Sequence, residues 1–458
     1  MIDVAAAPGD KCQDVIIVGA GLAGTVLAMF LARRGLSVEL LERSSEPARA
    51  CASAEAGASS INLTLCVRGL DALDQIGVGA AVRERMVALF HRATHREDGT
   101  VHYQRYGAND EALGAVQRED LLAVLRAEAL RLYGVRPRLG VEVTGVDSAT
   151  GTVTMRDRSK QQSSASASLV IGADGAFSTV RTLLGKTGHI RESVERADMA
   201  YRQFDVRPAG GWTARTDALH LWPRGGEMLL AIPNRDGTFT AAALLPATGS
   251  ASHGSLTESA AIDAHFRRSY PDAFDFIPSL PEQFLGRRKV LMVTVTCEPW
   301  SCGRILLIGD AAHAVVPSYG QGANFAFEDC SILAGFIDES PGETVAAAAR
   351  FARSRAPDAR AIADLSLQHL IDLRSTMADP RFVVRSSIES KLASLYPDDY
   401  RPLYETVAFT KTPYREAVTR GNRWRPVVDK LCAISDAAPE SPLPGDQAMH
   451  AAVRELAP

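Results

Sequence analysis

A GxGxxG motif near the N-terminus is the first place where residue types and spacing imply chemistry; its glycines are Gly19, Gly21 and Gly24. The motif follows the apolar run 15–18 and precedes an Ala/Leu-rich stretch, so we expect a buried strand, a tight turn and a helix. Free N–H groups at the start of such a helix bind a diphosphate. Glu42 ends the next apolar run, where a carboxylate accepts hydrogen bonds from an adenosine ribose, and Arg43 is its neighbour. This combination predicts a dinucleotide-binding site.

The same stretch, Val15–Ala32, carries no charge and is long enough to be scored as a membrane span. Its glycines favour the strand, turn and helix instead. Gly19 permits a tight turn, Gly21 lets the backbone approach a pyrophosphate, and Gly24 lets the helix pack on the strand. We therefore expect a dinucleotide site here and no membrane helix.

Two aspartates stand where further apolar strands are expected to end. Asp174 lies in a Gly-Ala-Asp-Gly turn and Asp310 in the run Gly-Asp-Ala-Ala-His. This edge of an open α/β sheet is the usual ligand position, and an aspartate there can accept from a ribityl or ribose hydroxyl. Either residue alone could equally cap a helix. A third element is expected to open a helix and to offer amide donors to an electron-rich ring oxygen; it consists of Gly320, Gln321, Gly322, Ala323 and Asn324.

The order of these three elements resembles the class A flavin-dependent monooxygenases, which include the aromatic-ring hydroxylases. The resemblance runs from Asp14 to about Arg420. Within that class, the segments 60–63 (SINL), 220–225 (HLWPRG) and 231–234 (AIPN) resemble kynurenine 3-monooxygenase. The family implies FAD, held tightly without a covalent bond, and NADPH as a transient reductant.

The resemblance also implies the reaction. Reduced flavin takes up O₂ as a C4a-hydroperoxide and passes a hydroxyl group to an electron-rich ring, while the protein places the ring and excludes water. Arg118 matches the family arginine that reaches the FAD. We take Pro317 and the turn Gly320, Gln321, Gly322 as the wall beside the isoalloxazine. No Ser/His/Asp nucleophile and no metal site are expected.

Kynurenine is an amino acid, and the family binds its carboxylate with an arginine and tyrosines. The matching positions are Arg92, Tyr106 and Tyr414. A bidentate guanidinium with two hydroxyl donors suits an anion, and Arg92 and Tyr106 lie in a segment expected to form strands over the flavin. The residues alone leave another interpretation open, because an arginine in HRATHRED is often solvated and a tyrosine before glycine often only ends a strand.

Two expected pocket positions depart from the family pattern. His369 replaces a usual asparagine in a helix expected to cap the pocket, and Tyr319 replaces a residue that is often histidine. His369 could recognise a different ring substituent, or it could be a structural histidine. The substrate therefore stays open between L-kynurenine, or a close 2-aminoaryl amino acid, and another tryptophan-derived, anthranilate- or indole-type aromatic. A non-hydroxylating flavoprotein or flavin-binding scaffold is a remote alternative.

A large α/β framework must position these residues. We expect a three-layer, Rossmann-like FAD-binding domain, a mainly antiparallel substrate-binding sheet and a C-terminal helical lid region. Hairpin signals between Ala218 and Pro246 support the antiparallel sheet, and the apolar run 303–308 returns to the first one. The FAD-binding domain is assigned to 1–80, 110–185 and 290–345, the substrate domain to 81–109 and 186–289, and the lid to 346–458.

In the lid we expect helices over 343–355, 358–377 and 384–395, and a loose Pro/Ala-rich end over about the last twenty residues.

Composition excludes several other classes. The 458 residues carry a formal net charge of −4, with no basic surplus for nucleic acid. Seven cysteines, odd in number and without CxxC spacing, indicate reduced thiols and no zinc site. The start lacks a signal-peptide pattern and the tail is too short and polar to span a bilayer. We expect a cytoplasmic enzyme, monomer or homodimer, whose partners are a small aromatic substrate and O₂.

Overall fold

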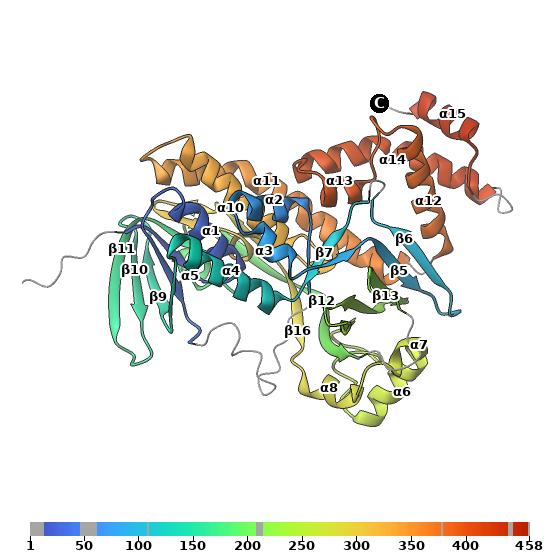
Figure 1. The fold of residues 1–458 in the computed structure, drawn as a ribbon, viewed down its shortest axis with the longest axis horizontal. Helices are drawn as coiled ribbons and strands as arrows, with labels where there is room; N and C mark the ends of the chain where they lie inside the picture. Colours follow the sequence, from blue (N-terminus) through green and yellow to red (C-terminus); the bar gives the residue numbers. More distant parts are fainter. Residues whose placement is uncertain are drawn as a thin grey trace, which may run out of the picture.

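The computed structural model describes residues 13–45, 62–107, 110–207, 214–376, 379–437 and 443–456. Ser60 and Ile61 of the SINL segment lie outside these residues. The described chain forms an eight-stranded sheet, a seven-stranded sheet and a small three-stranded sheet, followed by a group of helices at the C-terminal end (Figure 1).

The eight-stranded sheet is parallel around the glycine-rich turn. β1 (Gln13–Val18) lies between β2 (Val38–Glu42) and β11 (Gln162–Gly172), and β18 (Ile305–Leu307) pairs with the other edge of β11. The second half of β1 is apolar and fully covered, as a central parallel strand requires. The chain returns to this sheet at β18, which confirms our expectation that the apolar run 303–308 belongs to it.

Further strands extend this sheet at its edges. β8 (Pro137–Leu139) pairs with β2 in parallel, and β17 (Ser301–Cys302) pairs with β18 antiparallel. β9 (Glu142–Asp147) and β10 (Thr152–Arg156) pair antiparallel with the first half of β11, and form the long projection on the left of Figure 1.

Helix α1 (Leu22–Ala32) follows the glycine-rich turn and packs against α4 (Arg118–Tyr133) and α10 (Gly322–Asp338). The expected order of strand, turn and helix is therefore confirmed. In the described ranges, no helix has the length and apolar character needed to cross a membrane. Four shorter helices complete this part of the chain: α2 (Val67–Gln75), α3 (Gly79–Arg83), α5 (Thr179–Lys186) and α9 (Asp310–His313).

The seven-stranded sheet is antiparallel except for one parallel pair, β13 with β5, so the expected mainly antiparallel sheet is confirmed. Its strands in spatial order are β16 (Val290–Glu298), β12 (Arg191–Val206), β15 (Phe239–Pro246), β14 (Glu227–Pro233), β13 (Ala218–Arg224), β5 (His91–His95) and β6 (Val101–Arg105). One strand lies in a different sheet from the one that our domain division implies. We assigned residues 290–345 to the FAD-binding domain, but β16 pairs with β12 of the seven-stranded sheet.

The two faces of this sheet have different neighbours. Helices α6 (Ser259–Ser269), α7 (Pro271–Phe274) and α8 (Leu280–Gly286) cover one face, at the bottom of Figure 1. Because side chains alternate along a strand, Trp222 of β13 points into that helical core while Leu221 belongs to the apolar cluster on the opposite face.

A three-stranded antiparallel sheet pairs β7 (Leu113–Val116) with β3 (Leu63–Leu65) and β4 (Val87–Leu89).

The C-terminal region is more helical and more continuous than expected. α11 (Thr344–Ile371) runs unbroken through Pro357, where we expected two helices, and ends in the π-helical turn η3 (Asp372–Thr376). α12 (Pro380–Leu395), α13 (Leu403–Phe409) and α14 (Tyr414–Ala437) follow. The expectation of a loose end is wrong for α15 (Asp446–Leu456), whose apolar side packs against α12 and α14.

Candidate active site

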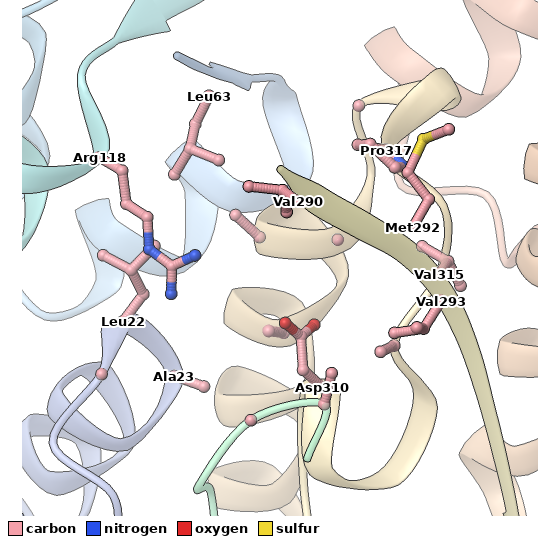
Figure 2. Close-up of a pocket in the computed structure, with 18 of the residues that line it drawn as sticks. Leu22, Ala23, Leu63, Arg118, Val290, Met292, Val293, Asp310, Val315 and Pro317 are labelled. Carbon is pink, nitrogen blue, oxygen red and sulfur yellow. The ribbon is translucent and has the colours of Figure 1, made fainter. Parts of the chain in front are cut away.

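A cavity of about 560 Å³ extends from the carboxyl ends of the parallel strands to the inner face of the seven-stranded sheet. Its volume falls in the range of ligand sites, roughly 300–1,000 Å³. Figure 2 shows its central part, with Arg118 and Asp310 pointing into the same space and Pro317 on the far wall. Residues of both large sheets and of α11 and α13 line it.

The glycine-rich turn has the geometry that its sequence predicts. Gly19 has φ +105°, and a Cβ on it would lie 2.5 Å from the Ala173 carbonyl oxygen. A Cβ on Gly24 would lie 1.9 Å from the Gly19 carbonyl oxygen, so only glycine lets the helix pack this closely. A Cβ on Gly21 would meet no atom within 4 Å, which leaves its backbone open to the cavity.

Glu42 and Arg43 line the cavity beside this turn. The two oxygens of the Glu42 carboxylate are oriented by main-chain donors: Oε2 accepts from Ala20 N at 3.0 Å and Oε1 from Ser44 N at 2.8 Å. Each carboxylate oxygen has a second lone pair, so both remain able to accept from a ligand hydroxyl.

The two strand-end aspartates differ in what they contact. Asp174 accepts from the Ser178 hydroxyl at 2.5 Å and from Thr179 N at 2.7 Å, so it holds the start of α5 as well as lining the cavity. Asp310, at the start of α9, accepts no hydrogen bond from the residues that the structure describes, and its carboxylate points into the cavity (Figure 2). Asp310 is therefore the freer acceptor for a ligand hydroxyl.

The 317–324 segment divides into residues that line the cavity and residues that hold the segment. Pro317, Gly320, Gly322 and Ala323 line it, whereas Gln321 and Asn324 are not among the lining residues. Our assignment of these last two to direct contacts stays a prediction, which their main-chain amides and not their side chains would have to make.

The amide side chains of these two residues are engaged inside the protein. Asn324 Oδ1 accepts from Cys66 N at 2.9 Å, and its Nδ2 donates at 2.8 Å to the Thr64 carbonyl oxygen. Gln321 Oε1 accepts from the Tyr414 hydroxyl at 3.0 Å. These contacts tie the start of α10 to β3 and so fix the turn from behind.

A buried ionic network lies behind α9 and α10. Arg355 Nε donates to Asp329 Oδ1 at 2.9 Å and its Nη2 to Glu328 Oε2 at 2.7 Å. Arg68 binds the other oxygen of Glu328 at 2.8 Å, and His313 lies 2.6 Å from Asp329. Since the charges are paired and hydrogen-bonded, the network can be buried and fixes both helices. Sequence reasoning did not identify it, because its members are spread over four helices.

The substrate end of the cavity collects polar side chains from segments far apart in sequence. Arg92 comes from β5, Tyr106 follows β6, Tyr319 lies in the short helix η2 (Pro317–Tyr319), and His369 lies in α11. Tyr404 of α13 completes the group, with its ring centroid 5.8 Å from Tyr106 and 5.2 Å from Tyr319. Among the described residues, none donates to or accepts from the three tyrosine hydroxyls.

Tyr404, and not Tyr414, is the third tyrosine of this end. Tyr414 is fully buried under the Arg68 guanidinium, 4.2 Å from its ring centroid, and its hydroxyl is bound to Gln321. It does not line the cavity, so our assignment of Tyr414 to the carboxylate is corrected. Nothing in the sequence distinguished the two residues, which lie ten positions apart in the same helical region.

Burial sets the protonation of this end. It raises the pKa of Tyr106 to about 12 and raises the pKa values of Tyr319 and Tyr404, so these hydroxyls remain protonated donors. Burial first, and then the nearby Arg92 charge, lower the pKa of His369 to about 3, so its ring is neutral. Arg92 is thus the only charge among the five side chains.

Arg92 is held from behind by residues of β6 and α12. Its Nη2 donates to the Gln104 Oε1, and Gln104 in turn donates to the Ser386 hydroxyl. The guanidinium carbon lies 5.6 Å from the ring centroid of Phe382. No described residue occupies the other guanidinium nitrogens of Arg92, which leaves them to a ligand.

The described residues fit an extended dinucleotide with a ring system. The glycine-rich turn has no room for a Cβ at Gly19 or Gly24 but leaves an open approach at Gly21. Asp310, whose carboxylate accepts no hydrogen bond from the described residues, points into the middle of the cavity (Figure 2). A family model described as FAD binding domain matches residues 12–348. The fold and the cavity therefore define an FAD-dependent monooxygenase, as expected from the sequence.

Comparison with individual proteins narrows this class. The kynurenine 3-monooxygenase of Myxococcus xanthus is 37% identical over 423 residues, covering 91% of this chain and 90% of its own. That of Salinispora arenicola is 37% identical over 416 residues, covering 90% of this chain and 91% of its own. The chain belongs to the kynurenine 3-monooxygenase family, and is an enzyme that uses FAD and NADPH.

A more distant solved structure agrees in fold. The tetrameric form of 2-methyl-3-hydroxypyridine-5-carboxylic acid oxygenase superposes with a TM-score of 0.65 at 20% identity, covering 83% of this chain and 96% of that one. The flavin-binding scaffold that we kept as a remote alternative is set aside by the family membership.

Proposed function

We propose that this enzyme hydroxylates ring position 3 of L-kynurenine, consuming NADPH and O₂. One observation supports the proposal above all: a single cavity connects the glycine-rich dinucleotide turn to an arginine surrounded by three free tyrosine hydroxyls. An arginine and hydroxyl donors in a partly dry site suit a carboxylate. The apolar inner face of β13 and β14 borders that end and suits an aromatic ring.

For the cofactor we propose the following contacts. The amides after Gly21 bind the diphosphate, and Glu42 with Arg43 binds the adenosine end. Arg118 and Asp310, which point into the middle of the cavity in Figure 2, bind the diphosphate and a ribityl hydroxyl. Asp174 binds a ribityl hydroxyl as well, through its remaining lone pairs. The isoalloxazine ring of the FAD lies against Pro317, Gly320, Gly322 and Ala323.

Bound FAD supplies the redox chemistry that activates O₂. The protein's contribution is positioning. Arg92, Tyr106 and Tyr404 bind the carboxylate, which fixes the aromatic ring at one end. Amide N–H groups at the start of α10 stabilise negative charge on the flavin ring, and the apolar side chains of the inner sheet face exclude water from it.

The direct test uses purified holoenzyme with NADPH, O₂ and L-kynurenine. We expect 3-hydroxykynurenine in amounts that match the NADPH consumed. Rapid NADPH consumption that yields only peroxide would contradict the proposal, because kynurenine would then stimulate the enzyme without being its substrate. Arg92→Met provides the matched control, since it should lower both product and stimulation.

His369 and Tyr319 support a second candidate, an anthranilate- or indole-type substrate from tryptophan. Both residues line the substrate end and depart from the family pattern. This candidate predicts stronger stimulation of NADPH oxidation by anthranilate or tryptophan than by L-kynurenine, measured with the same preparation.

We further propose a cytoplasmic enzyme that is a monomer or homodimer and that keeps the three-part division of the chain, with β16 reassigned to the substrate sheet. The parallel and antiparallel sheets support that division. Light scattering coupled to gel filtration of the holoenzyme tests the oligomeric state.

A further inference from the structure

Arg126 of α4 lies behind the glycine-rich turn. Its Nη2 donates at 2.6 Å to the carbonyl oxygen of Ala20, the residue between Gly19 and Gly21. Arg126 is half-buried and is not among the described residues that line the cavity. Reasoning from the sequence did not find this contact, because it joins positions 106 residues apart.

Both main-chain groups of Ala20 are bound by side chains. Its N–H donates to Glu42 at 3.0 Å. Its carbonyl oxygen accepts from Arg126 and, at 3.3 Å, from the hydroxyl of the buried Thr25. A charged donor makes a stronger hydrogen bond than a hydroxyl, so Arg126 contributes most of the restraint on this carbonyl. The peptide that joins Ala20 to Gly21 is therefore oriented from the protein side of the turn.

The N–H of Gly21 belongs to the same peptide unit as the Ala20 carbonyl. Because a trans peptide is planar, its carbonyl oxygen and its N–H point in opposite directions. With the carbonyl oxygen directed toward α1 and α4, the N–H of Gly21 is directed away from both helices. It donates to no residue of the described chain, and Gly21 lines the cavity. The N–H of Gly21 is therefore a free donor on the open side of the turn.

The guanidinium of Arg126 is not fully used inside the protein. Its Nε is buried and has no hydrogen-bond partner in the described chain. Burial lowers the pKa of Arg126 and the nearby Glu42 carboxylate opposes that effect, but an arginine stays protonated at neutral pH. A buried donor without a partner opposes folding. A charged side chain kept in such a place, directly behind the turn, favours a role in ligand binding.

We propose that Arg126 is a positioning residue for the FAD diphosphate: by holding the Ala20 carbonyl from behind the turn, it directs the N–H of Gly21 toward the diphosphate. The inference rests on the proposed cofactor contacts, in which the amides after Gly21 bind the diphosphate. It adds the N–H of Gly21 to those donors, and it assigns the orientation of that donor to a side chain that does not touch the cofactor.

The test measures the dissociation constant of FAD from the full-length holoenzyme, by following the rise of free-flavin fluorescence as the enzyme is diluted. Arg126→Met keeps the length of the side chain but removes its donors, and should weaken FAD binding about 10-fold. This is the lower end of the value of a hydrogen bond from a charged group, because Thr25 keeps part of the restraint. Arg126→Lys retains a charged donor and should restore most of the affinity.

A double-mutant cycle with Gly21→Ala separates positioning from a merely structural role. If Arg126 acts through the peptide of Gly21, Arg126→Met should weaken FAD binding by less than about three-fold once Gly21→Ala already hinders the approach of the diphosphate. Arg131→Met is the matched control, because Arg131 is an exposed arginine of the same helix that pairs with Glu128. It should leave the dissociation constant unchanged in both backgrounds.

The outcomes distinguish this inference from the proposal on which it rests. Equal weakening by Arg126→Met in the wild-type and Gly21→Ala backgrounds would overturn the inference, because Arg126 would then act independently of Gly21. An unchanged dissociation constant in Arg126→Met would overturn it too. If Gly21→Ala itself leaves FAD binding unchanged, the proposed approach of the diphosphate to Gly21 is wrong, and this inference is wrong with it.

Discussion

The two ends of the cavity are built in different ways. At the dinucleotide end, main-chain geometry dominates: a turn with φ +105° at Gly19, a helix that packs closely at Gly24, and strand ends that meet at one edge. At the substrate end, five side chains arrive from β5, the end of β6, η2, α11 and α13. The first end depends on a short stretch of sequence, whereas the second depends on the packing of the whole chain. Their responses to mutation should differ accordingly.

The largest effect is expected from Gly24→Val, which attacks the dinucleotide end. Its Cβ would lie 1.9 Å from the Gly19 carbonyl oxygen, so α1 must move away from β1. Overpacking of this kind costs about 1–3 kcal/mol or more, and the displaced turn should weaken FAD binding at least about 100-fold. Flavin absorbance of the purified protein and FAD titration measure the loss.

Gly21→Ala is the matched control, because its Cβ meets no protein atom. The FAD-free variant should unfold at the wild-type temperature, while FAD binds more weakly. If FAD binding is unchanged in this variant, the diphosphate does not approach the backbone at Gly21.

Arg92→Met should produce the second largest effect, now confined to the substrate end. Loss of the one charge there should raise the KM for L-kynurenine about 100-fold, since charge-assisted bidentate contacts are the strong ones. FAD content should stay at the wild-type level because Arg92 is distant from the glycine-rich turn in the fold. A KM that does not change would show that the carboxylate binds elsewhere.

Tyr404→Phe and Tyr414→Phe test the corrected choice of tyrosine. Tyr404→Phe removes a free hydroxyl from the cavity and should raise the KM about 5- to 10-fold, the value of one hydrogen bond. Tyr414→Phe removes the hydroxyl bound to Gln321, behind the turn, and should leave the KM near wild type while changing stability. Steady-state kinetics and thermal unfolding separate the two results, and the reverse pattern would restore Tyr414 to the substrate site.

Much of the dinucleotide end could be predicted because its requirements are local. The apolar run before the GxGxxG motif fixes β1, and each glycine has a reason within a few residues of itself. The α/β fold class with a second, antiparallel sheet could be predicted for the same reason, because the hairpin signals of 218–246 and the apolar run before Asp310 are also local features of the sequence.

What the sequence could not show depends on distant contacts. The wrong tyrosine was chosen because the direction of α13 and α14 decides which hydroxyl enters the cavity. Asp174 and Asp310 have similar local sequences, yet among the described contacts only the Asp174 carboxylate accepts hydrogen bonds from the start of a helix, α5. α11 continues through Pro357 although proline lacks the N–H that a helix interior uses, and Arg355, two residues before it, is fixed by the buried ionic network.

The smallest expected effect is on the pH dependence of the free energy of unfolding, and it comes from His369 at the substrate end. It distinguishes the two ends of the cavity because no described histidine lines the dinucleotide end. The pKa of His369 is about 3 in the folded enzyme, below the ordinary value of 6.5 expected in the unfolded chain. Between these values the unfolded chain binds the extra proton, so this contribution to stability is present above about pH 6.5 and is lost as the pH falls toward 3. His369→Asn should therefore reduce the loss of unfolding free energy between about pH 7 and pH 5.5 by about 1 kcal/mol. Denaturant unfolding of the holoenzyme at both pH values measures it, with the exposed His189→Asn as control. An equal pH dependence in all three proteins would show that the pKa of His369 is not lowered in the folded state.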